Sequence, residues 1–77
     1  MLDQRMKIRE FISDNFLFGN DEGLSDDTSF LEEGILDSTG ILELVEFLEE
    51  TFSIKVKDEE LIPENLDSIA NILRYIG

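Results

Sequence analysis

The residues best placed to do chemistry in this chain are the hydroxyl pair Ser38 and Thr39, which follow Asp37. They lie where a long polar segment gives way to a strongly patterned helix. The first turn of a helix has backbone N–H groups without intrahelical acceptors and carries the positive end of the helix dipole. A serine there can cap those N–H groups, or it can carry a phosphate that the same groups favour. Position alone favours capping, so the surrounding sequence must decide.

Several other chemistries are excluded by composition. The chain has no Cys and no His, which rules out disulfides, thiolate or imidazole metal sites and His-based acid–base catalysis. The residues before Gly19 and Gly23 lack the ligand spacing of a calcium-binding EF-hand loop. A nucleophilic Ser38 would have only acids nearby, and nothing is placed to activate its hydroxyl. We therefore expect neither an enzyme nor a metal site.

The net charge of −13 is unevenly distributed. No Lys or Arg occurs between Arg9 and Lys55, whereas thirteen acids lie in that interval. This distribution argues against nucleic acid and anionic membranes as partners, because both bind basic groups. A basic protein surface is the natural complement, with electrostatically steered association. The alternative is that the acids only keep the chain soluble.

Length and hydropathy predict one domain over residues 1–77. Its hydrophobic content of 42% is typical of a folded domain. The longest apolar run, Phe16-Leu17-Phe18, is too short to span a membrane or to form a signal-peptide core. We therefore expect a cytoplasmic, monomeric protein.

The first helix is expected from Asp3 to Phe16, because apolar side chains recur there every four residues. These are Ile8, Ile12 and Phe16, with Leu2 and Met6 near the same face. A loop rich in turn residues should follow from Leu17 to Asp37, with a short helical turn over residues 28–32. Four apolar residues are expected to pin this loop to the core, namely Phe30, Leu31, Ile35 and Leu36.

The second helix is expected from Ser38 to Phe52, with one face buried and the opposite face acidic. The buried stripe comprises Ile41, Leu44, Val45, Leu48 and Phe52. The acidic stripe comprises Glu43, Glu46 and Glu50, with Glu49 at its edge. Leu42 and Phe47 flank the buried stripe, and we expect both to pack against neighbouring helices.

The C-terminal third should contain a connection over Ser53–Lys57 and a short helix over residues 58–62. Pro63 is expected to end that helix, because it lacks an N–H and restricts the preceding residue. The last helix should start near Asn65 or Asp67 and bury Ile69, Ile72, Leu73 and Ile76. Long amphipathic helices must bury their stripes against each other, which predicts an all-α bundle with one long loop.

Three stretches together resemble the acyl carrier protein family: residues 28–38, the helix from Ile41 to Phe52, and residues 65–69. The resemblance covers nearly the whole chain and implies a four-helix bundle with a short third helix and no enzymatic activity. It further implies that a phosphopantetheinyl transferase attaches 4′-phosphopantetheine from coenzyme A to Ser38, with Asp37 as the flanking acid. An acyl or aminoacyl group would then be carried as a thioester on the attached arm, so the chain itself needs no Cys.

The partners implied by this resemblance are the transferase, an acyl- or aminoacyl-loading ligase and downstream acyl-processing enzymes with basic surfaces. The surface offered to them would comprise Thr39, Glu43, Glu46, Glu49 and Glu50. The chain departs from fatty-acid carriers at three positions. Those carriers commonly have a large apolar residue where this chain has Thr39, an Asp where it has Gly40, and an exposed apolar residue where it has Glu46. With the longer stretch over residues 62–65, these departures resemble free-standing carriers of other pathways.

Carriers of fatty chains often hold their cargo between the helices. The candidates to line such a space are Leu48, Val56, Leu61 and Ile72. We expect a filled core instead. Bulky Leu61 and Phe47 would leave less room for a long chain, so a short or polar cargo is expected. An acidic, non-catalytic helical adaptor without a prosthetic group remains the alternative function. The two functions differ in the covalent state of Ser38.

Overall fold

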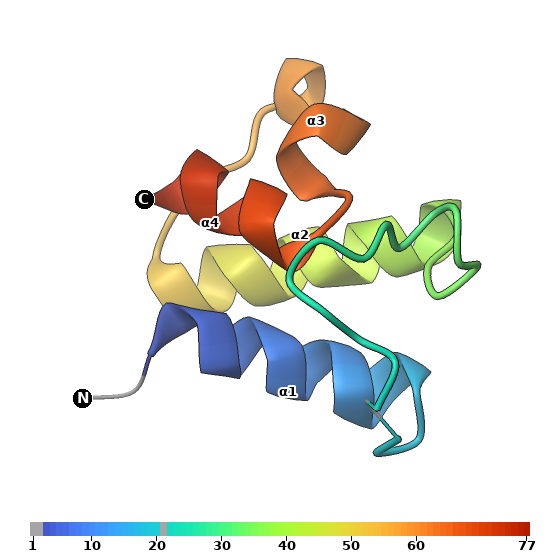
Figure 1. Cartoon of the computed structure of the whole chain (residues 1–77). Helices are drawn as coiled ribbons and strands as arrows, with labels where there is room; N and C mark the ends of the chain where they lie inside the picture. Colours follow the sequence, from blue (N-terminus) through green and yellow to red (C-terminus); the bar gives the residue numbers. More distant parts are fainter. Residues whose placement is uncertain (1–2, 21) are drawn as a thin grey trace.

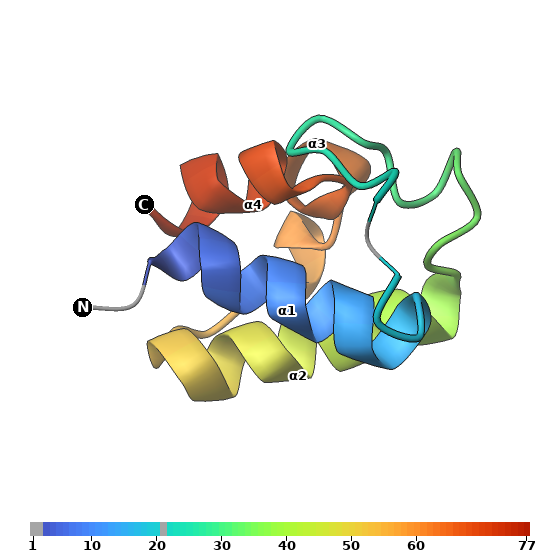
Figure 2. The same ribbon diagram turned by 60° about the horizontal axis from the view of Figure 1, so that its bottom comes forward.

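In the part of the chain that the structure describes, four helices and one short 3-10 turn make up the fold. The computed structural model describes residues 3–20 and 22–77, and these contain no strand. The elements are α1 (Gln4–Phe16), α2 (Ser38–Phe52), η1 (Asp58–Glu60), α3 (Pro63–Leu66) and α4 (Ile69–Ile76). Helices α1 and α2 lie side by side and run in opposite directions, while α4 packs against α1 (Figures 1 and 2). The predicted all-α four-helix bundle with a long first loop and a short third helix is confirmed.

Side chains that precede the three longer helices cap their first turns. Asp3 accepts a hydrogen bond from the Arg5 backbone N–H at 3.0 Å, so α1 begins at the predicted point. Ser68 accepts one from the Asn71 N–H at 3.1 Å and opens α4. The last helix was expected to start near Asn65 or Asp67; it starts shortly after Asp67, but neither Asn65 nor Asp67 is its cap. Each holds another segment in place, and α4 begins at Ile69.

Helix α3 departs most from the sequence-based expectation. Pro63 is its first residue and not the end of the preceding helix. The missing N–H of a proline costs nothing at a first helical position, because that N–H would have no intrahelical acceptor. The helix predicted over residues 58–62 exists only as η1. The amide of Asn65 donates to the Glu60 carbonyl at 3.0 Å and holds η1 against α3.

The long loop after α1 is tied to the segment between α3 and α4. The Phe30 N–H donates to the Asp67 carbonyl at 2.8 Å, and the Asp67 carboxylate accepts from the Ser29 hydroxyl and the Leu31 N–H. The predicted helical turn near residues 28–32 is a hydrogen-bonded turn shifted to residues 30–34, not a helix.

A second tie joins the middle of the loop to the first and last helices. The Arg5 guanidinium pairs with the Asp26 carboxylate at 2.7 Å, and the Asp26 carbonyl accepts from the Ala70 N–H at 2.9 Å. The hydrogen bond to Asp26 and the attraction of its charge raise the pKa of Arg5. Together the two ties fix the loop that leads into α2.

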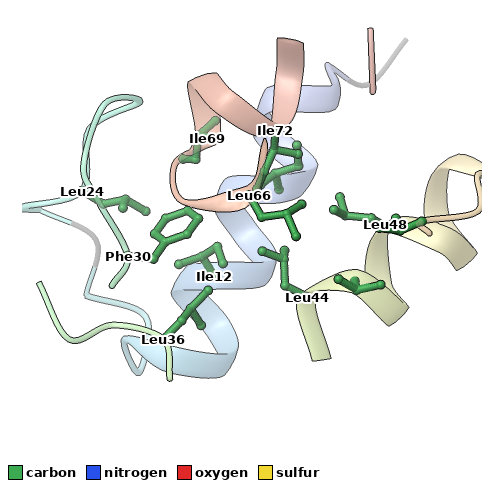
Figure 3. Packing of buried hydrophobic residues seen from close by; sticks show 12 residues of the cluster. Ile12, Leu24, Phe30, Leu36, Leu44, Leu48, Leu66, Ile69 and Ile72 are labelled. Atoms are coloured by element: carbon green, nitrogen blue, oxygen red, sulfur yellow. The ribbon is translucent and has the colours of Figure 1, made fainter. Parts of the chain in front are cut away.

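The core is closely filled by side chains from all four helices and the loop (Figure 3). Its fully buried members are Phe30, Ile8, Ile12, Leu44, Leu48, Leu66, Ile69 and Ile72. Phe30 and Leu36 pin the loop as predicted, but Leu31 is exposed and does not. Met6 is also exposed instead of lying on the buried face of α1, and Leu2 lies outside the described residues. No helix within residues 3–20 and 22–77 is long and apolar enough to cross a membrane.

Candidate functional site

Ser38 is the first residue of α2, and its side chain is exposed. It does not cap the helix, so capping as the role of this serine is wrong. The cap is Asp37, whose backbone is extended and whose Oδ1 accepts from the Gly40 N–H at 2.8 Å. The Asp37 carbonyl also accepts the first helical bond, from the Ile41 N–H at 2.9 Å. Ser38 is already inside the helix, so its hydroxyl cannot reach the N–H groups that a cap satisfies.

The hydroxyl of Ser38 has no hydrogen-bond partner in the part of the chain that the structure describes. The backbone N–H groups of Ser38 and Thr39 likewise have no acceptor among those residues. A helix start with free N–H groups favours a bound anion. The site therefore combines an unengaged hydroxyl with two donors and the positive end of a four-turn helix.

Gly40 sets how closely the start of α2 approaches its neighbours. A Cβ at this buried position would lie 3.0 Å from Leu36 Cδ2 and 3.3 Å from Phe16 Cε1. Any larger residue would require the side chains of Leu36 and Phe16 to shift by a few tenths of an ångström. The absence of the Asp often found here in fatty-acid carriers thus has a packing reason.

An apolar cleft opens directly beside Ser38, between α2 and the segment that contains α3. Its volume is about 340 Å³, and its lining comprises Leu31, Ser38, Ile41, Leu42, Leu61, Ile62, Pro63, Leu66 and Asp67. The rim is unusually apolar for a surface, because Leu31 is 43%, Leu42 60% and Ile62 40% exposed. The expectation that Leu42 packs against a neighbouring helix is therefore wrong: α3 stops short of covering it.

Of the four residues predicted to line a cargo space, only Leu61 borders this cleft. Leu48, Val56 and Ile72 belong to the closely packed core, as the filled-core expectation required. Sequence reasoning missed the rim residues Leu31 and Ile62. Their signal was weak, since both lie outside the helices and only the tertiary arrangement brings them to α2.

The acidic stripe lies on the surface of α2, where Thr39, Glu43, Glu46 and Glu50 are all exposed. Glu49 differs from the others, because it is half-buried and its carboxylate accepts from the Val56 N–H at 2.9 Å. It ties the end of α2 to the following connection. Phe47 packs as predicted, with its ring stacked on Phe11 at a centroid distance of 4.2 Å.

Comparison with known proteins gives concordant matches. Residues 7–76 match the family model described as "phosphopantetheine attachment site". The acyl carrier protein of Akkermansia muciniphila is 39% identical over 70 residues, which cover 91% of this chain and 84% of that protein. The probable acyl carrier protein PigG of a Serratia species is 29% identical over 70 residues, covering 91% and 80%.

A solved structure has the same arrangement of helices. It is a chain in the crystal structure of an FAD-dependent dehydrogenase, with a TM-score of 0.77 and 30% identity. The match covers 87% of this chain and 94% of that one, so the two chains are of similar length.

Proposed function

The chain belongs to the acyl carrier protein family, and from this premise we propose that Ser38 is the residue on which it carries its prosthetic group. Members of the family are carriers and not enzymes, and their cofactor is covalently attached 4′-phosphopantetheine. The observation that carries the assignment to Ser38 is its exposed hydroxyl, which Asp37 frees from capping.

The residues around Ser38 fit a phosphodiester at this point. The free N–H groups of Ser38 and Thr39 and the positive end of the helix dipole favour an added negative charge. Asp37 holds the first turn in place through the Gly40 N–H, so the helix start does not depend on the Ser38 oxygen. That oxygen can be esterified without loss of a structural bond.

The prosthetic group supplies a terminal thiol, on which an acyl or aminoacyl group is held as a thioester. The chain itself anchors the group through the Ser38 oxygen and presents a surface to partner enzymes. We propose that this surface includes Thr39, Glu43, Glu46 and Glu50, which are exposed on the same helix. Glu49 contributes less than we expected from the sequence, because its carboxylate is engaged with the Val56 N–H.

The family implies a phosphopantetheinyl transferase and biosynthetic enzymes as partners. More specifically, we propose a ligase that loads an acyl or aminoacyl group and enzymes with basic surfaces that act on it afterwards. The similarity to a chain in the crystal structure of an FAD-dependent dehydrogenase makes flavin dehydrogenases one class worth testing. A short or polar cargo is proposed, because Leu48, Val56 and Ile72 are buried in the core and do not line the cleft beside Ser38.

Intact-mass measurement after incubation with coenzyme A and a broad-specificity phosphopantetheinyl transferase tests this proposal. The parent chain should gain one phosphopantetheine. Ser38→Ala should gain none, whereas the matched control Thr39→Ala, which removes the neighbouring hydroxyl, should still be modified. If the parent gains nothing while the transferase modifies a control carrier, Ser38 is not an attachment site. The acidic adaptor would then be the better description.

A further inference from the structure

Phe18, in the turn that follows α1, is the most exposed large apolar side chain among the described residues. It is 98% exposed, whereas the next, Leu42, is 60% exposed. Within residues 3–20 and 22–77 its ring makes no contact with another ring, and it is not among the side chains that pack on the core. Single exposed apolar residues are common on protein surfaces and need no explanation by themselves. The backbone of Phe18 is what sets this residue apart.

Phe18 has a left-handed backbone conformation. Its φ is 55°, and that of Gly19 is 83°. The Asn20 N–H donates to the Leu17 carbonyl at 2.9 Å and closes a tight turn around these two residues. Positive φ at both central residues is typical of a type I′ turn, in which Gly, Asn and Asp predominate. A bulky residue is an outlier there, because its Cβ comes too close to the following carbonyl oxygen.

The end of α1 does not require a phenylalanine at this position. The Ser13 carbonyl accepts from the Leu17 N–H at 3.1 Å and from the Gly19 N–H at 2.9 Å, so backbone atoms alone make these bonds. Glycine would allow the same turn without the steric cost of a Cβ. The ring of Phe18 thus adds strain to the turn and buries almost none of its own surface. Strain of this kind is concentrated at functional sites.

The turn lies at the end of the molecule where α2 begins, because α1 runs toward that end and α2 starts from it (Figures 1 and 2). A Cβ at Gly40 would lie 3.3 Å from Phe16 Cε1. Phe18 is two residues beyond Phe16, and Ser38 is two residues before Gly40. Two residues span at most about 7 Å of chain. An enzyme interface of standard size covers about 800 Å² on each partner and is roughly 30 Å across. One enzyme can therefore cover both Ser38 and Phe18.

We propose that Phe18 is a docking anchor for the phosphopantetheinyl transferase that modifies Ser38, with its ring inserted into an apolar pocket of that enzyme. The transferase is the partner because it must bring its active site to the Ser38 oxygen itself. Enzymes that act on the carried group meet the far end of the prosthetic arm and need not approach this turn. The inference rests on the proposed function, since it takes Ser38 as the attachment residue.

An aromatic ring on a tight turn suits this role. Aromatic side chains bury a large area at an interface, and residues that fill a pocket of the partner often contribute much of the binding energy. The turn fixes the position of the side chain before the enzyme arrives, which lowers the entropic cost of docking. A second copy of the chain is the competing occupant, and its own net charge of −13 opposes that contact.

Steady-state kinetics of a broad-specificity transferase, with this chain as the varied substrate and coenzyme A at saturation, test the proposal. Phe18→Ala removes the ring and keeps a Cβ, so the KM for the chain should rise at least fivefold while kcat stays unchanged. Phe18→Leu keeps a large apolar side chain and should raise KM less. The matched control Met6→Ala removes another exposed apolar side chain, near the start of α1, and its KM should stay within twofold of the parent.

Thermal unfolding separates the contact made by the ring from the strain in the backbone. Phe18→Gly removes both the ring and the strained Cβ, so it should raise the Tm by about 4 °C and raise KM as much as Phe18→Ala does. Phe18→Ala keeps the strain and should have a Tm close to that of the parent. An increased KM in Phe18→Ala together with an unchanged KM in Phe18→Gly would overturn the proposal, because the conformation of the turn would then matter and the ring would not.

The inference and the proposed function fail in different ways. If Ser38 is modified with the same KM in the parent, Phe18→Ala and Phe18→Gly, the inference is overturned and the carrier assignment stands. If the parent is not modified by a transferase that is active on a control carrier, both are overturned. Sedimentation of the parent as a dimer and of Phe18→Ala as a monomer would also overturn the inference, because a second copy would then cover the ring.

Discussion

Asp37 and Ser38 are adjacent, but their backbones place them in different environments. Asp37 has extended torsion angles (φ −108°, ψ −169°), which turn its carboxylate toward the Gly40 N–H, whereas Ser38 has entered the helix. An aspartate at this position both satisfies a donor and interacts favourably with the helix dipole. Ser38, where modification is proposed, consequently makes no hydrogen bond on which the start of the helix depends.

Substitutions at these two residues should therefore have different effects on stability. Asp37→Ala should lower the free energy of unfolding by about 1 kcal/mol, because the first turn loses its cap. Ser38→Ala should change it by less than about 0.5 kcal/mol, as expected for an exposed side chain without partners. Urea denaturation followed by circular dichroism measures both values. A loss at Ser38 as large as that at Asp37 would show that the serine shares the capping role.

Tyr75 provides a second test at the level of single residues, since it is the only tyrosine and the chain has no tryptophan. Burial, and then a 3.0 Å hydrogen bond to Glu60, raise the pKa of its phenol above the ordinary value of about 10. Absorbance at alkaline pH should show this shift in the folded protein and an ordinary midpoint in urea. Glu60→Gln should lower the midpoint only in part, because burial remains the larger cause.

The same shift has a consequence for stability. As pH rises, the unfolded chain loses the phenolic proton first, so the stability contributed by Tyr75 is complete below about pH 10. It decreases as pH rises through the folded pKa. Tyr75→Phe should remove this part of the pH dependence, and an unchanged alkaline profile would contradict the assignment.

At the scale of elements, Asp67 connects the long loop to the segment between α3 and α4. Its carboxylate accepts from the Ser29 hydroxyl and the Leu31 N–H, and its carbonyl accepts from the Phe30 N–H. Phe30 is fully buried, so these bonds fix the segment that inserts this ring into the core. They also place Leu31 on the rim of the cleft beside α2.

Asp67→Ala should therefore destabilise the protein more than its partial exposure suggests. Hydrogen bonds to a charged group contribute roughly 1.5–3 kcal/mol, and we expect a loss near the lower end, about 2 kcal/mol. Amide hydrogen exchange should become faster at Leu31, whose N–H loses its acceptor. Glu64→Ala, at an exposed site on α3, is the control and should change stability by less than about 0.5 kcal/mol. Equal effects would show that Asp67 does not anchor the loop.

The elements differ in how far the sequence could predict them. The 3.6-residue periodicity located α1 and α2 almost to the residue, because each helix buries one continuous stripe. It could not locate α3, since four residues are too few to show a period and Pro63 can either open or end a helix. The cleft was missed for a related reason. Leu31, Leu42 and Ile62 come from three segments and meet only in the folded chain.

At the scale of the whole molecule, charge dominates the response to conditions. A net charge of −13 on a chain of 77 residues repels itself when the chain is compact. Arg5 pairs with Asp26, but the chain has 19 acids and only 6 basic residues, so opposite charges offset little of this repulsion. Small domains are stable by only about 5 kcal/mol, and a change of 1 kcal/mol is therefore large.

Salt should consequently stabilise the fold. The Debye length falls from about 10 Å at 0.1 M to about 3 Å at 1 M, which screens repulsion among surface carboxylates. Raising NaCl from low concentration to 0.5 M should add about 1 kcal/mol, equivalent to roughly 4–8 °C in Tm for a domain of this size. Differential scanning calorimetry measures the increment. The stabilisation by salt should be smaller for Glu46→Lys/Glu50→Lys. Each Glu→Lys change makes the net charge two units less negative, so the double variant has −9 instead of −13.

The same salt series should weaken binding of a partner enzyme with a basic surface to the exposed carboxylates of α2, since that attraction is screened as well. Stability and affinity thus move in opposite directions as salt is added, and both responses should shrink in Glu46→Lys/Glu50→Lys. A general solvent effect on apolar burial would instead raise Tm equally in both proteins. If the parent and the variant gained the same increment, self-repulsion of the carboxylates would not be what limits the stability of the folded chain.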